Sequence, residues 1–399
     1  MKLLFLVAEQ SYFCTHRLNL GKTAKAAGFE VAVATRYQEN PVLGQEELNH
    51  KRQIQAAGIQ VFPLKYFTRS GLNPVSQWLA LQELAKIYKT YSPDIVHHVG
   101  MKPVVLGTLI ARWYQIPKII NALGGLGYLF TDSKFIQPKQ ILLDLFNKIK
   151  KIKKNFLRAN VARLLNKLHS KENTVLILQN QDDIDTLVKS AGISAQKIHL
   201  IRGAGVDIQA FPVTPLPISP PIKIACVSRM LWDKGIGELV TAAKIIQQKK
   251  LPIQILLYGN PDPANPASIT PSQLQAWHNA GWVIWKGYCA DIASVYANCH
   301  IAVLPSYREG LPKSLLEAAS CGRAIVTTDV PGCREVVQHE NNGLLVPAQD
   351  AKALAEALIT LSQDSLLQAK MGLKSRQLVE YYFSDSKIHQ QTMALYQRT

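Results

Sequence analysis

Two carboxylates, Glu309 and Glu317, flank what reads as the start of a helix, with seven residues between them. The apolar run Ile301–Leu304 before them is typical of a short buried strand. Gly310 frees the backbone for a tight loop, and Pro312 suits a first helical turn, where its missing N–H is not needed. The unpaired N–H groups and the dipole of a helix start attract an anion or an electron-rich sugar oxygen. This arrangement indicates a nucleotide-sugar site.

A plainer explanation fits the same two acids. Glu317 follows Lys313 by four positions, so both side chains would lie on one helix face and form an ion pair worth about 0.2–0.5 kcal/mol. Glu309 would then be an ordinary acid near the positive end of a helix. The residues alone leave both interpretations open.

Two cations, Arg229 and Lys234, bracket a loop that leads from a predicted strand into a predicted helix. The helix dipole disfavours cations at this end, so two of them together indicate a bound anion such as a phosphate. In the alternative, both are surface cations, and Lys234 pairs with Asp233 or Glu238.

A glycine-rich run that includes Gly124 and Gly125 follows another predicted strand and would let a ligand approach the backbone closely. The run departs from the full dinucleotide-binding fingerprint, so we expect no nicotinamide cofactor. Asp183 and Asp185 have the spacing of a metal-binding Asp-x-Asp pair. They open a predicted helix, where carboxylates cap backbone N–H groups, so we expect no metal site.

Three histidines, His16, His97 and His98, fall near the carboxyl ends of predicted strands in the N-terminal half. A lone histidine is more often a hydrogen-bonded core residue than a ligand. Three of them at one sheet edge leave both a structural and a functional role open.

The elements that must position these residues alternate strands with helices along the chain, which predicts parallel sheets wrapped by helices. The predicted strands are Lys2–Val7, Glu30–Ala34, Gln60–Phe62, Ile95–His98, Ile119–Asn121, Thr174–Leu178, Ile198–Leu200, Ile222–Val227, Ile253–Leu257, Trp282–Trp285, Ile301–Leu304, Ala324–Thr327 and Gly343–Val346. The predicted helices are His16–Ala27, Gln45–Ala57, Pro74–Tyr91, Pro103–Tyr114, Pro138–Leu168, Gln181–Ser190, Ile236–Gln248, Pro271–Ala280, Ala290–Ala297, Pro312–Cys321 and Ala351–Gln363.

Five prolines in residues 211–221 exclude a helix or a central strand there and predict a linker. We therefore expect two doubly wound, Rossmann-like α/β domains, over residues 1–210 and 222–383, that face a cleft. The closing helical pattern, residues 384–399, has no strand after it. Ligands of such sheets bind beyond the carboxyl ends of the strands.

Composition bounds the class of protein. The chain has 399 residues, of which 47% are hydrophobic and 18% are charged, as in folded globular proteins of two or three domains. Six scattered cysteines without a Cys-x-x-Cys pair predict neither a zinc site nor disulfides, and they fit a reducing compartment. The first apolar run is too short for a signal peptide, and no stretch approaches the ~20 apolar residues of a spanning helix. We expect a cytoplasmic protein.

The net charge of +17 calls for a negatively charged partner. Eleven Lys or Arg residues lie between Lys134 and Lys171, with Asp144 as the one acid among them. Within the predicted helix 138–168 an apolar stripe alternates with lysines, which is typical of a helix resting on an anionic membrane surface. In the alternative, the stripe packs on the protein core and the lysines are solvated. No nucleic-acid-binding motif accompanies the charge, so we expect no nucleic-acid partner.

Several motifs in order resemble the nucleotide-sugar domain of glycosyltransferase family 4. They include Val227-Ser228-Arg229 with Asp233-Lys234-Gly235, Pro305-Ser306-Tyr307-Arg308-Glu309-Gly310, Leu315-Leu316-Glu317-Ala318 and Val330-Pro331-Gly332-Cys333-Arg334-Glu335. The N-terminal half resembles members that extend lipid-linked glycans, through Phe13-Cys14-Thr15-His16-Arg17, His97-His98-Val99-Gly100 and Asn121-Ala122-Leu123-Gly124-Gly125.

The resemblance implies the GT-B fold, with an N-terminal acceptor-binding domain, a C-terminal donor-binding domain and a last helix that returns to the first. It implies a retaining transfer without a metal or cofactor, in which Arg229 and Lys234 hold the donor diphosphate. Glu309 would orient the transferred sugar, and Glu317 would accept hydrogen bonds from the ribose.

The remaining donor contacts that the resemblance implies are backbone groups. Gly310, Leu311 and Lys313 would meet the sugar, and Gly287 and Tyr288 would meet the base. One position departs from the family pattern, because Gly124 stands where many members have a histidine. Gly124 and Gly125 would still approach the donor, and we assign the missing imidazole contact to His16.

We therefore expect a retaining glycosyltransferase that moves a hexose or N-acetylhexosamine from a nucleotide-sugar, expected to be a UDP-sugar, to a polyprenyl-diphosphate-linked saccharide. It would work at the inner face of the cytoplasmic membrane, in cell-envelope polysaccharide synthesis. Two alternatives stay open: a nucleotide-sugar epimerase or a phosphorylase on the same fold, and a non-catalytic partner subunit.

Overall fold

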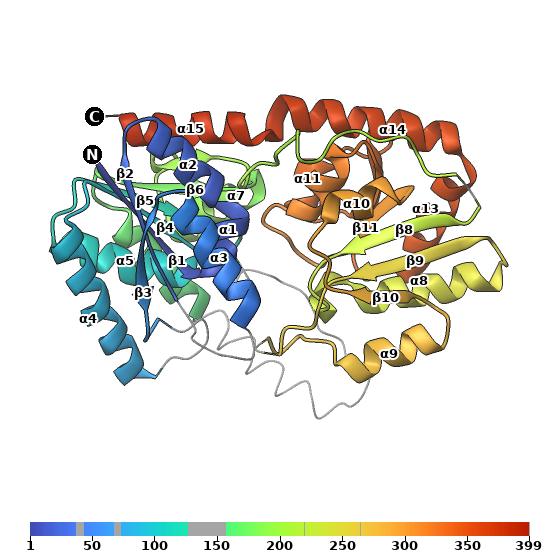
Figure 1. The fold of residues 1–399 in the computed structure, drawn as a ribbon, viewed down its shortest axis with the longest axis horizontal. Coiled ribbons are helices and arrows are strands. Elements are labelled where there is room, and N and C mark those ends of the chain that lie inside the picture. The colour runs from blue at the N-terminus through green and yellow to red at the C-terminus, as the bar shows by residue number, and fades with distance from the viewer. Residues whose placement is uncertain (37–43, 68–72, 127–156, 219, 264, 399) are drawn as a thin grey trace. The chain divides into compact units, whose positions relative to one another are not determined.

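The computed structural model describes residues 1–36, 44–67, 73–126, 157–218, 220–263 and 265–398 (Figure 1). The chain forms two compact units, one of Met1–Ala204 with His389–Thr399 and one of Gly205–Ile388. Each unit is built on its own parallel sheet with helices around it, which confirms the predicted fold class. The cleft between them stays a prediction.

The first unit contains a seven-stranded parallel sheet in the order β3-β2-β1-β4-β5-β6-β7. The strands are β1 Lys2–Glu9, β2 Glu30–Arg36, β3 Gln60–Leu64, β4 Ile95–Val99, β5 Lys118–Ala122, β6 Thr174–Leu178 and β7 Ile198–Leu200. All seven match predicted strands to within two residues at each end. Sequence order runs outward from β1 in both directions, which is the doubly wound pattern.

Helices cover both faces of this sheet (Figure 1). They are α1 Gln10–His16, α2 Leu18–Ala26, α3 Gly44–Ala56, α4 Pro74–Tyr91, α5 Met101–Trp113 and α7 Gln181–Ala191. The single predicted helix His16–Ala27 is wrong at its start, because the chain is already helical from Gln10 and is interrupted at Arg17. Most of the predicted basic helix 138–168 lies outside the described residues, and its last part, residues 157–168, is helical.

The second unit contains a six-stranded parallel sheet in the order β10-β9-β8-β11-β12-β13. Its strands are β8 Ile222–Val227, β9 Ile253–Tyr258, β10 Ile284–Gly287, β11 Ile301–Leu304, β12 Ala324–Thr328 and β13 Gly343–Val346. The helices that begin in it are α8 Ile236–Gln248, α9 Pro271–Asn279, α10 Ile292–Ala297, α11 Lys313–Ser320, α12 Cys333–Val336, α13 Ala351–Gln363, α14 Ser365–Leu378 and α15 Asp385–Gln397. α12 and α14 are absent from the predicted set.

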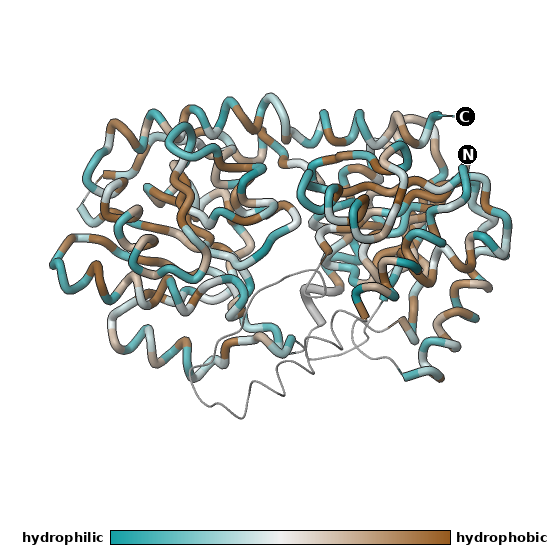
Figure 2. Tube along the Cα trace, turned by 180° about the vertical axis from the view of Figure 1, so that it is seen from behind, coloured by the Kyte–Doolittle hydropathy of each residue, from teal (hydrophilic) through white to brown (hydrophobic). Residues whose placement is uncertain are grey.

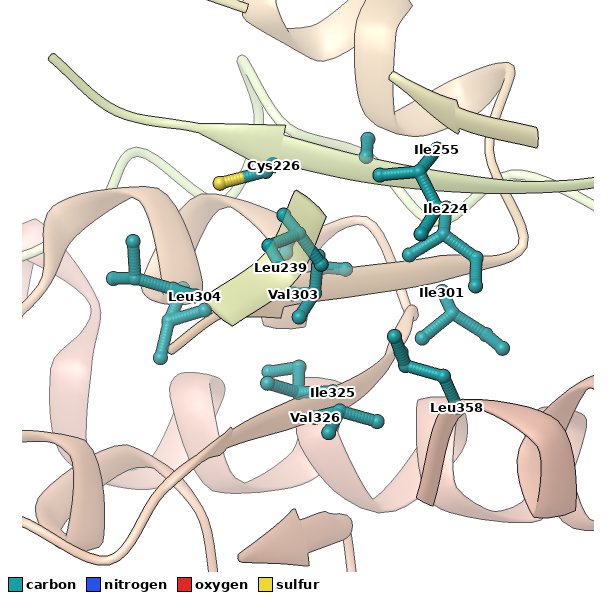
Figure 3. Close-up of a cluster of buried hydrophobic side chains, with 14 of the residues drawn as sticks. Ile224, Cys226, Leu239, Ile255, Ile301, Val303, Leu304, Ile325, Val326 and Leu358 are labelled. Atoms are coloured by element: carbon teal, nitrogen blue, oxygen red, sulfur yellow. The ribbon is translucent and has the colours of Figure 1, made fainter. Parts of the chain in front are cut away.

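The core of the second unit explains its strand pattern. Ile224, Ile301 and Val326 come from three neighbouring strands and meet Leu239 of α8 and Leu358 of α13, all fully buried (Figure 3). Strands covered on both faces read as continuous apolar runs, which is why the sequence identified them. Figure 2 shows the same division in each unit, with hydrophobic residues gathered along the strands and polar residues on the outer helices.

The proline-rich residues 211–218 lie against the second unit rather than standing apart from it. The buried guanidinium of Arg323 donates to the carbonyl oxygens of Thr214 and Pro215. Arg376 of α14 donates to the carbonyl oxygens of Ile208 and Phe211 at 3.1 and 2.9 Å. These contacts explain why the division between the units falls before Gly205.

In the described part of the chain, every helix is too short or too polar to cross a lipid bilayer.

Candidate functional site

The predicted donor-site residues of the second unit gather at one edge of its sheet. Parallel strands all end at the same edge, and four neighbouring strands end there in the order β10-β9-β8-β11. Gly287 ends β10, Arg229 follows β8, and Glu309 follows β11. The loop after β9 brings Asp262 to the same edge, a residue that the sequence analysis did not single out.

Lys234 and Glu309, 75 positions apart in sequence, form an ion pair there. The Lys234 Nζ lies 2.5 Å from Glu309 Oε1, and the Ser306 hydroxyl donates to the same oxygen at 2.6 Å. Only 19% of the lysine side chain and 11% of the glutamate side chain are exposed. The suggested pairing of Lys234 with Asp233 or Glu238 is therefore wrong, because the chain turns the lysine toward the loop after β11.

Two glycines allow this close approach of loops. Gly235 has a φ of +70°, and a Cβ there would lie 2.0 Å from the Pro305 carbonyl oxygen. Gly332 has a φ of +81°, and a Cβ there would lie 2.6 Å from the Glu309 carbonyl oxygen. Neither position accepts a side chain without moving the backbone that carries Glu309.

Arg229 also faces a carboxylate: its Nη1 lies 2.7 Å from Asp262 Oδ2. Asp233 lies within electrostatic reach of Arg229, Lys234 and Glu309, and burial raises its pKa. The Tyr307 hydroxyl donates to Glu238 Oε1 at 2.7 Å, so Glu238 of α8 is held by the loop after β11. Arg229 and Lys234 are thus each matched by an acid.

Glu317 lies in the second turn of α11, and its carboxylate is 3.7 Å from Lys313 Nζ, the helix pair that the plainer explanation foresaw. Its side chain is only 11% exposed. Burial raises its pKa to about 7, and the nearby Lys313 ammonium opposes that rise. Such a strongly perturbed carboxyl near the start of a helix is a candidate for a functional group as well as for a helix pair.

The raised pKa of Glu317 predicts a pH-dependent stability. The folded chain keeps the proton up to about pH 7, whereas the unfolded chain loses it near 4.5. The free energy of unfolding therefore falls as the pH rises through this window, by on the order of 3 kcal/mol in full. We expect Glu317→Gln to be more stable than the wild type at pH 8 but not at pH 5.

Urea unfolding at both pH values measures this difference, with the exposed Glu356→Gln as the control. An equal change at pH 5 and pH 8 would contradict the assignment of the shift to Glu317.

The remaining predicted donor contacts sit in loops and at a helix start. The Gly287 carbonyl oxygen accepts from the Gly259 N–H at 2.7 Å, and Tyr288 beyond it is 60% exposed. Gly310 and Leu311 lead into α11, which begins at Lys313. The sequence predicts Pro312 in the first turn of this helix. In the structure Pro312 is instead the N-cap residue, just before the first turn.

The first unit brings together the other predicted residues through Tyr12, which the sequence analysis gave no role. The Tyr12 and His16 rings stack at a centroid distance of 4.1 Å. A Cβ at Gly124 would lie 3.3 Å from the Tyr12 hydroxyl and 3.6 Å from the Gln179 amide nitrogen. His16 and Gly124 are therefore both neighbours of Tyr12, and Gly124 lies just after the end of β5. Gly125 follows with a φ of +136°.

The other singled-out residues are structural. His97 and His98 are buried, the former against the Tyr396 hydroxyl at 2.6 Å and the latter against that of Tyr88 at 2.7 Å. Asp183 is buried at the start of α7, and its N–H donates to the Asn180 side chain at 2.8 Å. The described residues hold no cluster of three or more His, Cys, Asp or Glu side chains that could bind a metal ion.

Asp262, Ser306 and Tyr12 are the partners that sequence reasoning missed. Asp262 lies three residues after Gly259, in the loop that follows a predicted strand, so its position near a carboxyl end was a usable signal. Ser306 and Tyr12 carried no comparable signal, because their roles depend on partners brought close by folding.

Two family models match the chain. One, described as glycosyl transferases group 1, matches residues 221–364, and the other, described as glycosyl transferase 4-like, matches residues 2–156. The chain is 29% identical over 369 residues to the N,N'-diacetylbacillosaminyl-diphospho-undecaprenol alpha-1,3-N-acetylgalactosaminyltransferase of Campylobacter jejuni, with 90% of each chain covered. It is 33% identical over 319 residues to the capsular polysaccharide biosynthesis glycosyltransferase CapM of Staphylococcus aureus, with 79% of this chain and 80% of CapM covered.

Solved structures share the fold. Sucrose-phosphate synthase from Thermosynechococcus elongatus superposes with a TM-score of 0.76 at 19% identity, over 99% of this chain and 98% of that one. Anabaena HepE in complex with UDP-glucose superposes with a TM-score of 0.73 at 19% identity, with the same coverage. At this identity the likeness shows the GT-B fold alone.

Proposed function

The chain belongs to the family 4 glycosyltransferases (group 1), and from this premise we propose that it transfers a hexose or N-acetylhexosamine from a UDP-sugar to a saccharide carried on a polyprenyl diphosphate. The observation that carries the proposal is the ion pair of Lys234 with Glu309, beside Arg229, at the carboxyl edge of the second sheet. The acceptor is proposed because the Campylobacter jejuni relative is named for a diphospho-undecaprenol substrate.

In the proposed reaction, configuration at the sugar is retained. The bond between sugar C1 and the diphosphate oxygen breaks, and the acceptor hydroxyl oxygen bonds to C1 on the same face. The acceptor proton passes to the departing diphosphate, so no separate protein base is needed. Arg229 and Lys234 offset the charge that grows on the diphosphate, a task for which no metal is required.

The sugar and the nucleoside have separate partners in this proposal. Glu309 orients the sugar, together with backbone groups of Gly310, Leu311 and Lys313. Glu317 accepts hydrogen bonds from the ribose. The chain has all the charged side chains that this reaction needs. Their presence argues against a non-catalytic partner subunit, because such a subunit would be free to lose them.

Nucleotide binding tests the donor site. We expect UDP to bind without added metal, more tightly than GDP or dTDP, and Arg229→Ala to weaken it by roughly 10–100-fold, because a charge-assisted hydrogen bond contributes about 1.5–3 kcal/mol. Calorimetry with a chelator present measures this. The control is Lys249→Ala, an exposed cation at the C-terminal end of α8, away from the strand ends. If no nucleotide binds, the non-catalytic alternative becomes the better account.

We further propose that the chain works peripherally at the inner face of the cytoplasmic membrane through its basic residues 138–168. A lysine near an anionic surface contributes roughly 1 kcal/mol, and salt screens that attraction. We expect replacement of the five lysines 148, 150, 151, 153 and 154 by glutamine to weaken binding to anionic vesicles at least about a hundredfold. Flotation with anionic and zwitterionic vesicles measures it. Unchanged binding at physiological salt contradicts the proposal.

A further inference from the structure

Arg229, a proposed ligand of the donor diphosphate, already has a carboxylate partner in Asp262. The Nη1–Oδ2 distance is 2.7 Å, and the arginine side chain is 47% exposed while that of the aspartate is only 15% exposed. An ion pair with one half-exposed member contributes little to stability. The main effect of the Arg229–Asp262 pair is therefore on the position of the Arg229 guanidinium and not on stability.

The loop that carries Asp262 is fixed without help from Arg229. Three backbone hydrogen bonds join the loops after β8 and β9: Met230 N–H to Asn260 O at 3.0 Å, Trp232 N–H to Ala267 O at 2.8 Å and Ile269 N–H to Met230 O at 2.9 Å. The Asp262 N–H donates to the Ser268 hydroxyl oxygen at 3.0 Å. Pro261 and Pro263 flank Asp262 and restrict its backbone further.

A fixed carboxylate sets the orientation of the mobile partner. Arg229 has a long flexible stem and a planar group whose five N–H donors form a rigid fork. The contact to Asp262 uses Nη1. Among the residues that the structure describes, no second carboxylate pairs with Arg229, so Nε and Nη2 are not committed to another acid. Because the group is planar, holding Nη1 also restricts the directions in which those two donors can point.

We propose that Asp262 is a positioning residue that holds the Arg229 guanidinium in the orientation in which it receives the donor diphosphate. This inference rests on the proposed function. It makes the loop after β9 part of the donor site without requiring that Asp262 touch the donor. The opposite role is a placeholder, in which Asp262 occupies Arg229 and competes with the diphosphate. The two roles predict changes of opposite sign.

A double-mutant cycle on the full chain distinguishes them. UDP affinity is measured by calorimetry for the wild type, Asp262→Ala, Arg229→Ala and the double variant, all without metal. We expect Asp262→Ala to weaken UDP binding about tenfold in the wild type and to change nothing further once Arg229 is alanine. Asp262→Asn keeps an oxygen acceptor at the same place, and we expect it to restore part of the affinity. Glu380→Ala, which removes the 2.6 Å contact with Arg376 elsewhere in the unit, is the matched control.

Other results overturn the inference. Tighter UDP binding by Asp262→Ala indicates a placeholder. An equal loss in the Arg229→Ala background indicates a direct or purely structural role, and no change in either background shows that Arg229 needs no orientation. Failure of the wild type itself to bind UDP contradicts the proposed function rather than this inference.

Discussion

Glu309→Gln is expected to lower kcat by about 100–1000-fold, the effect of removing one preorganised electrostatic contact from a transition state. The carboxylate is fixed by Lys234 at 2.5 Å and by the Ser306 hydroxyl at 2.6 Å, so it is held in place before any substrate binds. Glutamine has the same shape and still accepts both hydrogen bonds. It lacks the charge that, in the proposed reaction, orients the sugar and balances Lys234.

Kinetics with a UDP-sugar and a lipid-linked acceptor measure the effect. Calorimetric UDP affinity, which we expect to change less than kcat, shows that the variant is folded and still binds nucleotide. Glu356→Gln, an exposed acid of α13, controls for the loss of one negative charge. A Glu309→Gln or Glu309→Ala protein with full activity would contradict the assignment of Glu309 as a catalytic residue.

Fold class and strand positions could be predicted because they depend on local patterns. A strand such as Ile301–Leu304 is buried on both faces, so every residue in it is apolar and the run is visible in the sequence. α1 was missed because Gln10–His16 is short and is rich in aromatic, cysteine and threonine residues, which favour helices weakly. α14 was missed because only part of one face is buried, including the polar residues Gln368 and Ser375.

The candidate site shows the same difference between what local sequence determines and what only folding determines. Arg229, Lys234, Glu309 and Glu317 stand next to strand ends or a helix start, so their positions could be inferred from local sequence. Their partners could not. The pair of Lys234 with Glu309 joins loops 75 positions apart and depends on Gly235 reaching the Pro305 carbonyl. Only the pairing of neighbouring strands determines such contacts.

A chain of buried hydrogen bonds crosses the first unit and contains two histidines. The Tyr88 hydroxyl donates to His98 Nε2 at 2.7 Å, and His98 Nδ1 donates to the Asn121 side-chain oxygen at 2.8 Å. The Asn121 amide then donates to His169 Nε2 at 3.0 Å, and His169 Nδ1 donates to the Leu165 carbonyl at 2.7 Å. Each imidazole is donor at one nitrogen and acceptor at the other. The network is therefore complete only while both rings are neutral.

Acid should destabilise the first unit through this network. Burial lowers the pKa of His98 and of His169 to about 4 each, and Arg112 and Lys197 near His169 act in the same direction. Unfolded histidine has a pKa near 6.5, so between pH 6.5 and 4 the unfolded chain binds more protons than the folded one. The free energy of unfolding then falls as the pH falls, with a slope of up to about 2.7 kcal/mol per pH unit for the two rings.

Removing one ring should remove part of that slope. We expect His98→Gln to be destabilised at pH 7.5, because it breaks the hydrogen bond to Tyr88 or to Asn121. Between pH 6.5 and 4.5 we expect it to lose less stability than the wild type.

Urea unfolding, monitored by hydrogen exchange of peptides from β4 and β5, reports on the stability of this unit. The exposed His339→Gln is the control. If His98→Gln and the wild type show the same slope, another group carries the acid sensitivity. The result bears on function because Asn121 lies in β5 only three residues before Gly124, so protonation of its histidine partners would loosen the backbone that leads into the proposed site.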